Sequence, residues 1–449
     1  MIDYKALMAV IKSEADSLGV KEYEIYSKSG SDTTVETLNG EINAFSSGTF
    51  SGICLRVSNG GRMGYAATEL MEESEMRSLV HRALENAKAT EKPDEVGIYS
   101  GADSYGMDKN PRGASQMDAA ELKSIAVRTA KGLYSYSDKV TDGTSTAAQS
   151  SSFTVRISNS HGLDLEASAT VSVVACEPVI SDGQAKESAY ELMKLDEDSD
   201  IDAMARQAVD TAVSKLGAGE VKSGKYNVVI DSRRMRMLLS AFSSVFSAKN
   251  AQMGLSLLKG KEGERIASEI VTITDDPMRD GACVMMPFDA EGVPTRRKNV
   301  VKNGVLQTLL YNRETAKREN KESTGNASKA GYASPVSTSP YAFCIEPGDR
   351  SLEELYALAG DGILITKLTG LHAGANATTG DFSLESAGFM IRGGKVCEPV
   401  KSFTVAGNFF ELLKSIAALS DTVELSVTGS STTFGSPYVL VRDMSVAGE

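Results

Sequence analysis

Apolar residues in the first half of the chain recur with two different periods, one typical of helices and one typical of strands. Helical spacing predicts amphipathic helices over residues 1–19, 70–90, 117–134 and 200–215. Alternation of apolar and polar residues predicts strands, which are Glu22–Ser27, Thr33–Leu38, Glu41–Phe45, Ile53–Val57, Met63–Ala67, Ser152–Ser158 and Leu163–Val173. Asn39-Gly40 between two of these runs is a strong hairpin signal, because both residues tolerate positive φ.

The second half begins after a polar, glycine-containing link at Glu220–Lys225. We therefore predict two domains, residues 1–220 and 221–449. In the second domain the pattern predicts helices over residues 232–248, 352–360 and 408–419, and strands at Tyr226–Ile230, Glu269–Thr274, Thr422–Val427 and Tyr438–Val446. Both halves mix helices with mainly antiparallel strands, so the expected fold class is α+β, with mixed sheets and flanking helices.

Composition narrows the class of protein. The chain has 449 residues, 41% hydrophobic and 24% charged, which is ordinary for a globular protein. Its net charge of -13 disfavours contact with nucleic acid, and no apolar run is long enough for a membrane helix. Five scattered cysteines without a Cys-x-x-Cys pair indicate a reducing compartment. We therefore expect a cytoplasmic protein that binds neither DNA nor membranes.

Candidate metal chemistry is limited by the histidines, of which there are three: His81, His161 and His372. No two of them have the i, i+4 spacing of a zinc-binding helix. His372 with Asp381 or Glu385 is a conceivable weak site, but a hairpin loop with a polar tip is the more economical interpretation.

One motif resembles a phosphate-binding loop but is better explained otherwise. Residues 219–225 match its first seven positions, but Tyr226 stands where magnesium binding needs a hydroxyl of Ser or Thr. The glycines also precede a predicted strand instead of a helix N-terminus, so no nucleotide or other cofactor is expected in this chain.

Four segments of the second half, occurring in a fixed order along the chain, carry a family resemblance. They are Val271–Pro277, Phe288–Arg297 with Asn303–Leu306, Glu322–Ala327, and Gly370–Lys395. Together with the hairpin layout of Tyr23–Ala67, they resemble the TldD/PmbA family, often labelled modulators of DNA gyrase. The resemblance implies two domains and a dimer or heterodimer. In the TldD-like branch it implies a zinc metalloprotease with His-Glu-x-x-x-His on a helix and a cysteine ligand near the C-terminus. The PmbA/TldE-like branch lacks those ligands.

Three residues occupy the positions of the family's zinc motif in our best register. Ser240, Ala241 and Val245 stand where the first histidine, the glutamate and the second histidine would fall. A slip of the register restores nothing, because residues 231–250 contain neither His nor Glu. Near the C-terminus, the segment Gly429–Gly435 has no cysteine. We therefore expect no catalytic, cofactor-binding or metal-binding residue in this chain.

The resemblance then implies a PmbA/TldE-like subunit that is non-catalytic alone and pairs with a zinc-bearing TldD-like protease, or with itself, to process small or unfolded peptides. Zinc is expected in the TldD-like partner. Two alternatives remain open at this point. One is a stand-alone peptidase with a site near His372. The other is a regulatory binding protein of the gyrase-modulator type.

Overall fold

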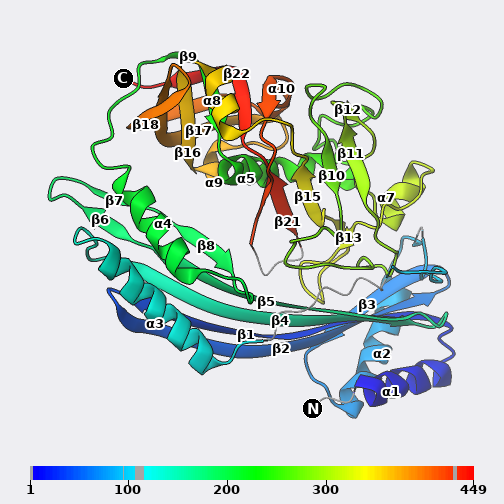
Figure 1. Cartoon of the computed structure of the whole chain (residues 1–449). Coiled ribbons are helices and arrows are strands. Elements are labelled where there is room, and N and C mark those ends of the chain that lie inside the picture. The colour runs from blue at the N-terminus through cyan, green and yellow to red at the C-terminus, as the bar shows by residue number, and fades with distance from the viewer. Residues whose placement is uncertain (1–3, 95, 107–115, 428–431) are drawn as a thin grey trace.

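The structure, a computed structural model, describes residues 4–94, 96–106, 116–427 and 432–449. Helices and mainly antiparallel strands occur in both halves (Figure 1), so the predicted α+β class is confirmed. None of the helices in these ranges combines the length and the apolar composition needed to span a bilayer.

The first half is built on one antiparallel sheet with the strand order β3-β2-β1-β4-β5-β8. Its strands are β1 (Glu22–Leu38), β2 (Glu41–Asn59), β3 (Arg62–Thr68), β4 (Ser145–Asn159), β5 (Asp164–Glu177) and β8 (Glu191–Lys194). With 17 and 19 residues, β1 and β2 are longer than most strands of globular proteins. Figure 1 shows this long sheet curving beneath the second half.

The hairpin predicted at Asn39-Gly40 joins β1 to β2. Asn39 has φ 54° and Gly40 has φ 84°, the left-handed values that a two-residue hairpin turn requires. The prediction of separate strands at Glu22–Ser27 and Thr33–Leu38 is wrong, because both belong to β1. The polar residues 28–32 between them remain extended because β2 pairs with them on one side and β4 on the other.

Helices cover one face of the sheet, and the second half lies against the other. The helices are α1 (Tyr4–Ser17), α2 (Glu73–Ala89), α3 (Ala119–Tyr136) and α4 (Ile201–Val213). On β1, Ile25 and Val35 point toward these helices, whereas Tyr26 packs against the second half. The four predicted helices are confirmed, and residues 1–3 of the first lie outside the described ranges.

One edge of this sheet is open. Strand β3 pairs only with Ile53–Asn59 of β2, so among the described residues no strand pairs with residues 41–52 of β2 on the side away from β1. Ile42, Phe45 and Phe50 lie on this segment and are 44%, 58% and 46% exposed. An open edge with exposed apolar side chains is a surface on which another strand can pair.

The second half contains a ring of strands. Five strands pair in the order β18-β17-β16-β9-β22, and β22 pairs with β18 to close the ring. They are β9 (Gly224–Ile230), β16 (Gly362–Thr369), β17 (Asp381–Arg392), β18 (Lys395–Asn408) and β22 (Val439–Ala447), with β19 (Ile416–Leu419) also on β22. The predicted strands Tyr226–Ile230 and Tyr438–Val446 correspond to β9 and β22 and are confirmed.

A second sheet lies beside the ring, in the order β12-β11-β10-β15-β21-β20. It consists of β10 (Ile273–Asp275), β11 (Lys298–Lys302), β12 (Val305–Leu306), β15 (Ala342–Ile345), β20 (Glu424–Leu425) and β21 (Thr433–Ser436). The strands predicted at Glu269–Thr274 and Thr422–Val427 are therefore largely wrong in their bounds, because turns and loop contacts replace most of each run.

Two of the helices predicted in this half end early. The helix predicted over residues 232–248 is α5 (Ser232–Phe242), followed by a 3₁₀ turn (Ser243–Phe246) and by α6 (Ala248–Gln252). The Ser243 hydroxyl donates to the carbonyl of Ser240, a local bond that competes with continuing the helix. The helix predicted over residues 408–419 is α10 (Phe409–Lys414), because the following residues pair with β22 as β19. The helix predicted over residues 352–360 is confirmed as α8 (Leu352–Ala359).

Candidate functional site

Helix α5 lies between the strand ring and the second sheet, on the side of the second half that faces the first half (Figure 1). It begins at Asp231, whose carboxylate accepts the Arg234 N–H at 2.7 Å and so caps the helix. One side of the helix is buried in the core of the second half, and its residues are Met235, Leu238, Leu239 and Phe242. Met237 and Ser240 on the other side are exposed.

The three positions expected to correspond to the zinc motif do not share one surface. Ser240 is exposed, Ala241 packs partly buried against the core, and Val245 is fully buried in the 3₁₀ turn. Their side chains end in a hydroxyl and in methyl groups, whereas catalytic zinc needs three strong ligands. This set of donors does not fit zinc. Among the described residues, no three or more His, Cys, Asp or Glu side chains are grouped so that they could hold a metal ion.

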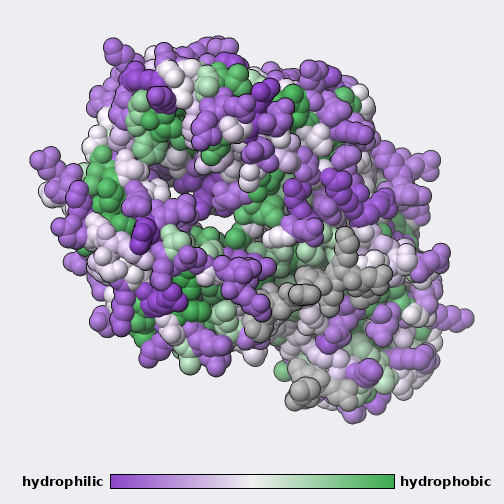
Figure 2. Space-filling view, viewed as in Figure 1, coloured by the Kyte–Doolittle hydropathy of each residue, from purple (hydrophilic) through white to green (hydrophobic). Residues whose placement is uncertain are grey.

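The polar side of α5 instead contacts the first-half sheet through β8 and the second sheet through β20. Arg233 donates to the Glu191 carboxylate on β8 at 2.5 Å and to the carbonyl of Tyr190 at 2.5 Å. Arg236 donates to the Glu424 carboxylate on β20 at 2.7 Å. Figure 2 shows a hollow between the two halves in this region. Arginine pairs, and not metal ligands, therefore fix α5 at the edge of this hollow.

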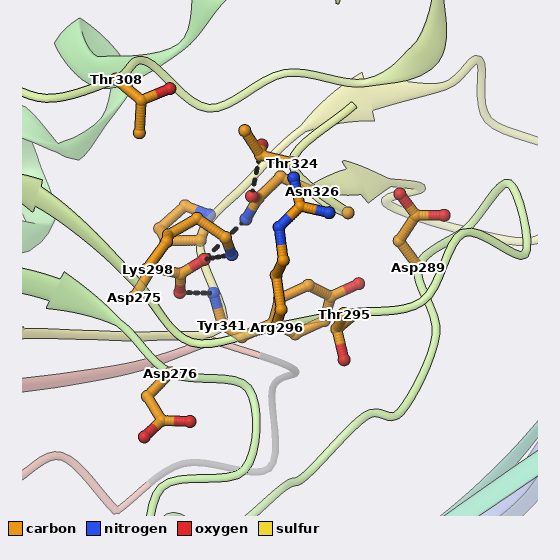
Figure 3. A network of polar contacts seen from close by, with 12 residues as sticks. Asp275, Asp276, Asp289, Thr295, Arg296, Lys298, Thr308, Thr324, Asn326 and Tyr341 are labelled. Atoms are coloured by element: carbon orange, nitrogen blue, oxygen red, sulfur yellow. Dashed lines mark hydrogen bonds and ion pairs between the residues drawn. The ribbon is translucent and has the colours of Figure 1, made fainter. Parts of the chain in front are cut away.

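Two of the four segments that carry the family resemblance meet at Asp275, which is inaccessible to solvent (Figure 3). Its carboxylate accepts bonds from Lys298 Nζ at 2.9 Å, from Asn326 Nδ2 at 2.7 Å and from the Tyr341 N–H at 2.7 Å. Thr324 donates to Asn326 Oδ1 at 2.7 Å and so orients that amide. Asp275, the last residue of β10, is thus an internal anchor that joins the start of β11 to two loops.

A second buried carboxylate organises the turn of the segment Phe288–Arg297. Asp289 accepts three backbone N–H bonds, from Glu291 at 2.9 Å, Val293 at 3.0 Å and Ala327 at 2.9 Å. Burial, followed by the charge of Glu291, raises the pKa of Asp289 to about 8, and the three N–H donors oppose that rise. Burial also raises the pKa of Glu291, which accepts the Arg313 N–H at 2.9 Å.

Sequence reasoning missed a buried ion pair on the first-half sheet. Arg56 and Glu24 are 4% and 3% exposed, and their charged groups lie 3.0 Å apart. Burial tends to lower the pKa of Arg56, but Glu24, followed by Tyr65 and Glu291, more than compensates and raises it. The available signal was a single arginine inside the apolar run Ile53–Val57, where a charge needs a partner.

The three histidines lie apart from one another and near the surface. His372 is exposed in the short helix α9 (Leu371–Gly374). No described hydrogen bond or ion pair joins it to Asp381, which accepts from Asn408 at 2.9 Å, or to Glu385, which accepts from Thr369 at 3.2 Å. His81 and His161 face Glu14 at 3.0 Å and Glu22 at 3.8 Å on the first half.

Comparison with known proteins agrees with this architecture. Three models of the PmbA/TldA metallopeptidase family match the chain: domain 1 at residues 23–87, the central domain at 112–216 and the C-terminal domain at 223–448. A metalloprotease of Methanothermobacter thermautotrophicus is 31% identical over 431 residues, which cover 91% of this chain and 92% of that protein. An uncharacterized protein of Methanocaldococcus jannaschii is 31% identical over 414 residues, with 91% and 92% covered.

Solved structures share the fold across the whole chain. A Thermotoga maritima protein named as a modulator of a DNA gyrase has a TM-score of 0.89 and 27% identity, with 99% of this chain and 100% of that one covered. TldE of Thermococcus kodakarensis has a TM-score of 0.85 at 24% identity, with 99% of this chain and 100% of that one covered. At this identity the similarity is one of fold. The chain therefore belongs to the PmbA/TldD family of metallopeptidase-like proteins, as the resemblance of its four segments predicts.

Proposed function

We propose that this chain is a PmbA/TldE-like, non-catalytic subunit of a TldD/TldE-type zinc metalloprotease complex that processes or degrades small or unfolded peptides. One observation carries the proposal: a chain that matches the family in all three regions has neither His nor Glu in residues 231–250, the segment onto which we place the family's zinc motif. Catalytic zinc requires about three protein ligands, and a general base must reach the bound water. The side chains of Ser240, Ala241 and Val245 supply neither.

The partner in this proposal is a TldD-like subunit that carries the zinc, with a homodimer as the alternative assembly, in the cytoplasm. Relatives of the chain include a protein named TldD homolog and a fold neighbour named TldE, which supports an assembly of two related chains. The open edge of β2 supports it too, because a partner strand or an extended peptide can add to the free side of an edge strand. The hollow beside α5 offers space for a peptide between the halves.

The test is metal analysis combined with peptide cleavage, on the chain alone and on the complex purified from its native cell. The chain alone should contain no stoichiometric zinc and should leave unfolded peptides intact. The complex should contain zinc in the partner subunit and should cleave the same peptides. Stoichiometric zinc together with cleavage by the isolated chain would contradict the proposal.

A matched variant separates this proposal from the peptidase alternative. His372→Ala changes the one histidine of the second half, and it lies at an exposed position, so the fold should tolerate it. The complex with this variant should cleave peptides at the rate of the unmodified complex. A loss of cleavage with unchanged zinc content would instead assign a catalytic role to His372.

A further inference from the structure

A cavity of about 500 Å³ lies at the junction of the two halves. Its first-half wall includes the hairpin of β6 (Val179–Ser181) and β7 (Lys186–Ser188) and the turn after α4. Its second-half wall comes from β16, β17, β18 and the first turn of α5. The link between the halves borders it, since Gly219 exchanges two backbone hydrogen bonds with β18, to Pro399 at 2.9 Å and from Lys401 at 3.0 Å.

Cations dominate the cavity although the whole chain is acidic, with a net charge of -13. The positively charged lining residues are Lys186, Lys215, Arg234, Lys367 and Lys401, and the negatively charged ones are Glu177, Glu187 and Glu385. The carboxylates are already engaged: Glu187 pairs with Lys401 at 3.1 Å, and Glu177 accepts from Ser188 at 2.8 Å. The side-chain amines of Lys186 and Lys367 have no hydrogen-bond or ion-pair partner among the described residues.

Of these cations, Lys215 is the one whose charge is least compensated, because it is neither fully solvated nor paired with a carboxylate. It is partly buried, and its Nζ donates to the carbonyl of Ser188 at 2.6 Å, with no carboxylate paired to it. Burial, followed by the charge of Arg234, lowers the pKa of Lys215; Lys367 acts in the same direction, and Glu187 and Glu191 oppose the shift only in part. Arg234 also pairs with the Asp231 carboxylate at 3.1 Å, which uses one part of its guanidinium group. Lys215 and Lys367 have no such partner, so an anion between these cations would relieve the repulsion that remains.

The strands that line the cavity have irregular pairing at neighbouring positions. The β16–β17 register shifts between Ile365 and Lys367, and the β17–β18 register shifts between Ser386 and Gly388. On β18 the shift includes Ser402, whose φ of 59° is unusual for a residue other than glycine. Bulges redirect side chains and leave backbone groups outside the strand ladder, and they are frequent beside binding sites. Here adjacent bulges turn Lys367 and Lys401 toward the cavity.

We propose that this cavity is a binding site for an anionic group, a carboxylate or a phosphate, held between Lys215, Arg234 and Lys367. The ligand would bridge the two halves, because Lys215 belongs to the first and the other two cations to the second. Two sources share this chemistry: the C-terminal carboxylate of a peptide and free inorganic phosphate. The site does not depend on the proposed function, since it involves neither zinc nor the partner subunit.

The test is isothermal titration of the full chain with inorganic phosphate, with a short peptide bearing a free C-terminal carboxylate, and with the same peptide amidated. Binding of the free-carboxylate peptide but not of the amidated one would support the site and assign it to peptide ends. Binding of phosphate alone would support it and assign it to phosphate. Absence of binding by both phosphate and the free-carboxylate peptide would overturn the proposal.

Variants then locate the site. Lys367→Gln should weaken binding roughly tenfold or more, because it removes one charge-assisted contact. Lys367 is exposed and unpaired, so this variant should melt like the unmodified protein. Lys395→Gln, at an exposed position at the start of β18, is the matched control and should bind normally. Equal affinity of the unmodified protein and Lys367→Gln would overturn the proposed site.

Discussion

Replacing Asp275 by alanine is expected to destabilise the second half by about 3–5 kcal/mol, the cost typical of breaking a buried ion pair from one side. Lys298 would keep its charge in a position where its side chain is 9% exposed, without its carboxylate 2.9 Å away. The amide of Asn326 and the N–H of Tyr341 would lose their acceptor as well. The effect should spread beyond β10, because Lys298 begins β11 and the other two donors lie on separate loops (Figure 3).

Urea unfolding, with the transition of each half followed separately, measures this effect. Asp202→Ala is a suitable control, because its ion pair with Arg128 lies at the surface, with side chains 48% and 60% exposed. Such an exposed pair contributes little to stability, because water and salt screen it. If both alanine variants lost the same small amount of stability, the role of Asp275 as an internal anchor would be wrong.

A loss of similar size, about 3–5 kcal/mol, is expected for Phe242→Ala. The Phe242 side chain is fully buried at the end of α5. Its ring stacks on Phe409 of α10, with centroids 4.6 Å apart and planes at 10°, and meets Phe382 of β17 edge-on at 6.3 Å. Truncation would leave a cavity among three elements that pack well only around this ring.

Met237→Ala on the same helix is the matched control, since Met237 is 37% exposed and its truncation opens no interior cavity. The control should change the free energy of unfolding by about 0.5 kcal/mol or less. Thermal or urea unfolding of both variants, measured in parallel, gives the two losses of unfolding free energy for comparison. Comparable losses would mean that α5 is not held by its aromatic contacts.

Sequence patterns correctly predict those turns and helices that depend on interactions between residues close together in the chain. The Asn39-Gly40 turn and the helices of the first half fall where their patterns predict, because turn residues and a helical apolar stripe act within a few positions. Long-range pairing decides the rest. Residues 416–419 continue the helical pattern of α10, yet they form β19 because β22 offers them a partner.

In the candidate site, too, some features can be read from the sequence and others depend on contacts between distant residues. The absence of His and Glu from residues 231–250 can be read directly from the sequence. The burial of Asp275 cannot, since Asp-Asp-Pro is typical of an exposed turn and its partners Lys298 and Asn326 are remote in the chain. The cationic cavity is equally hidden, because its walls come from both halves and depend on strand bulges that no local pattern announces.

The closed ring of the second half has a consequence for biosynthesis. β22 pairs with both β9 and β18, so the ring cannot close until the ribosome has synthesised β22. The sheet of the first half needs nothing beyond β8 and can assemble earlier, while translation continues. During that interval the unclosed strands of the second half expose their backbone hydrogen-bonding groups. Chaperones would therefore be needed mainly for residues between β9 and β22 of the nascent polypeptide.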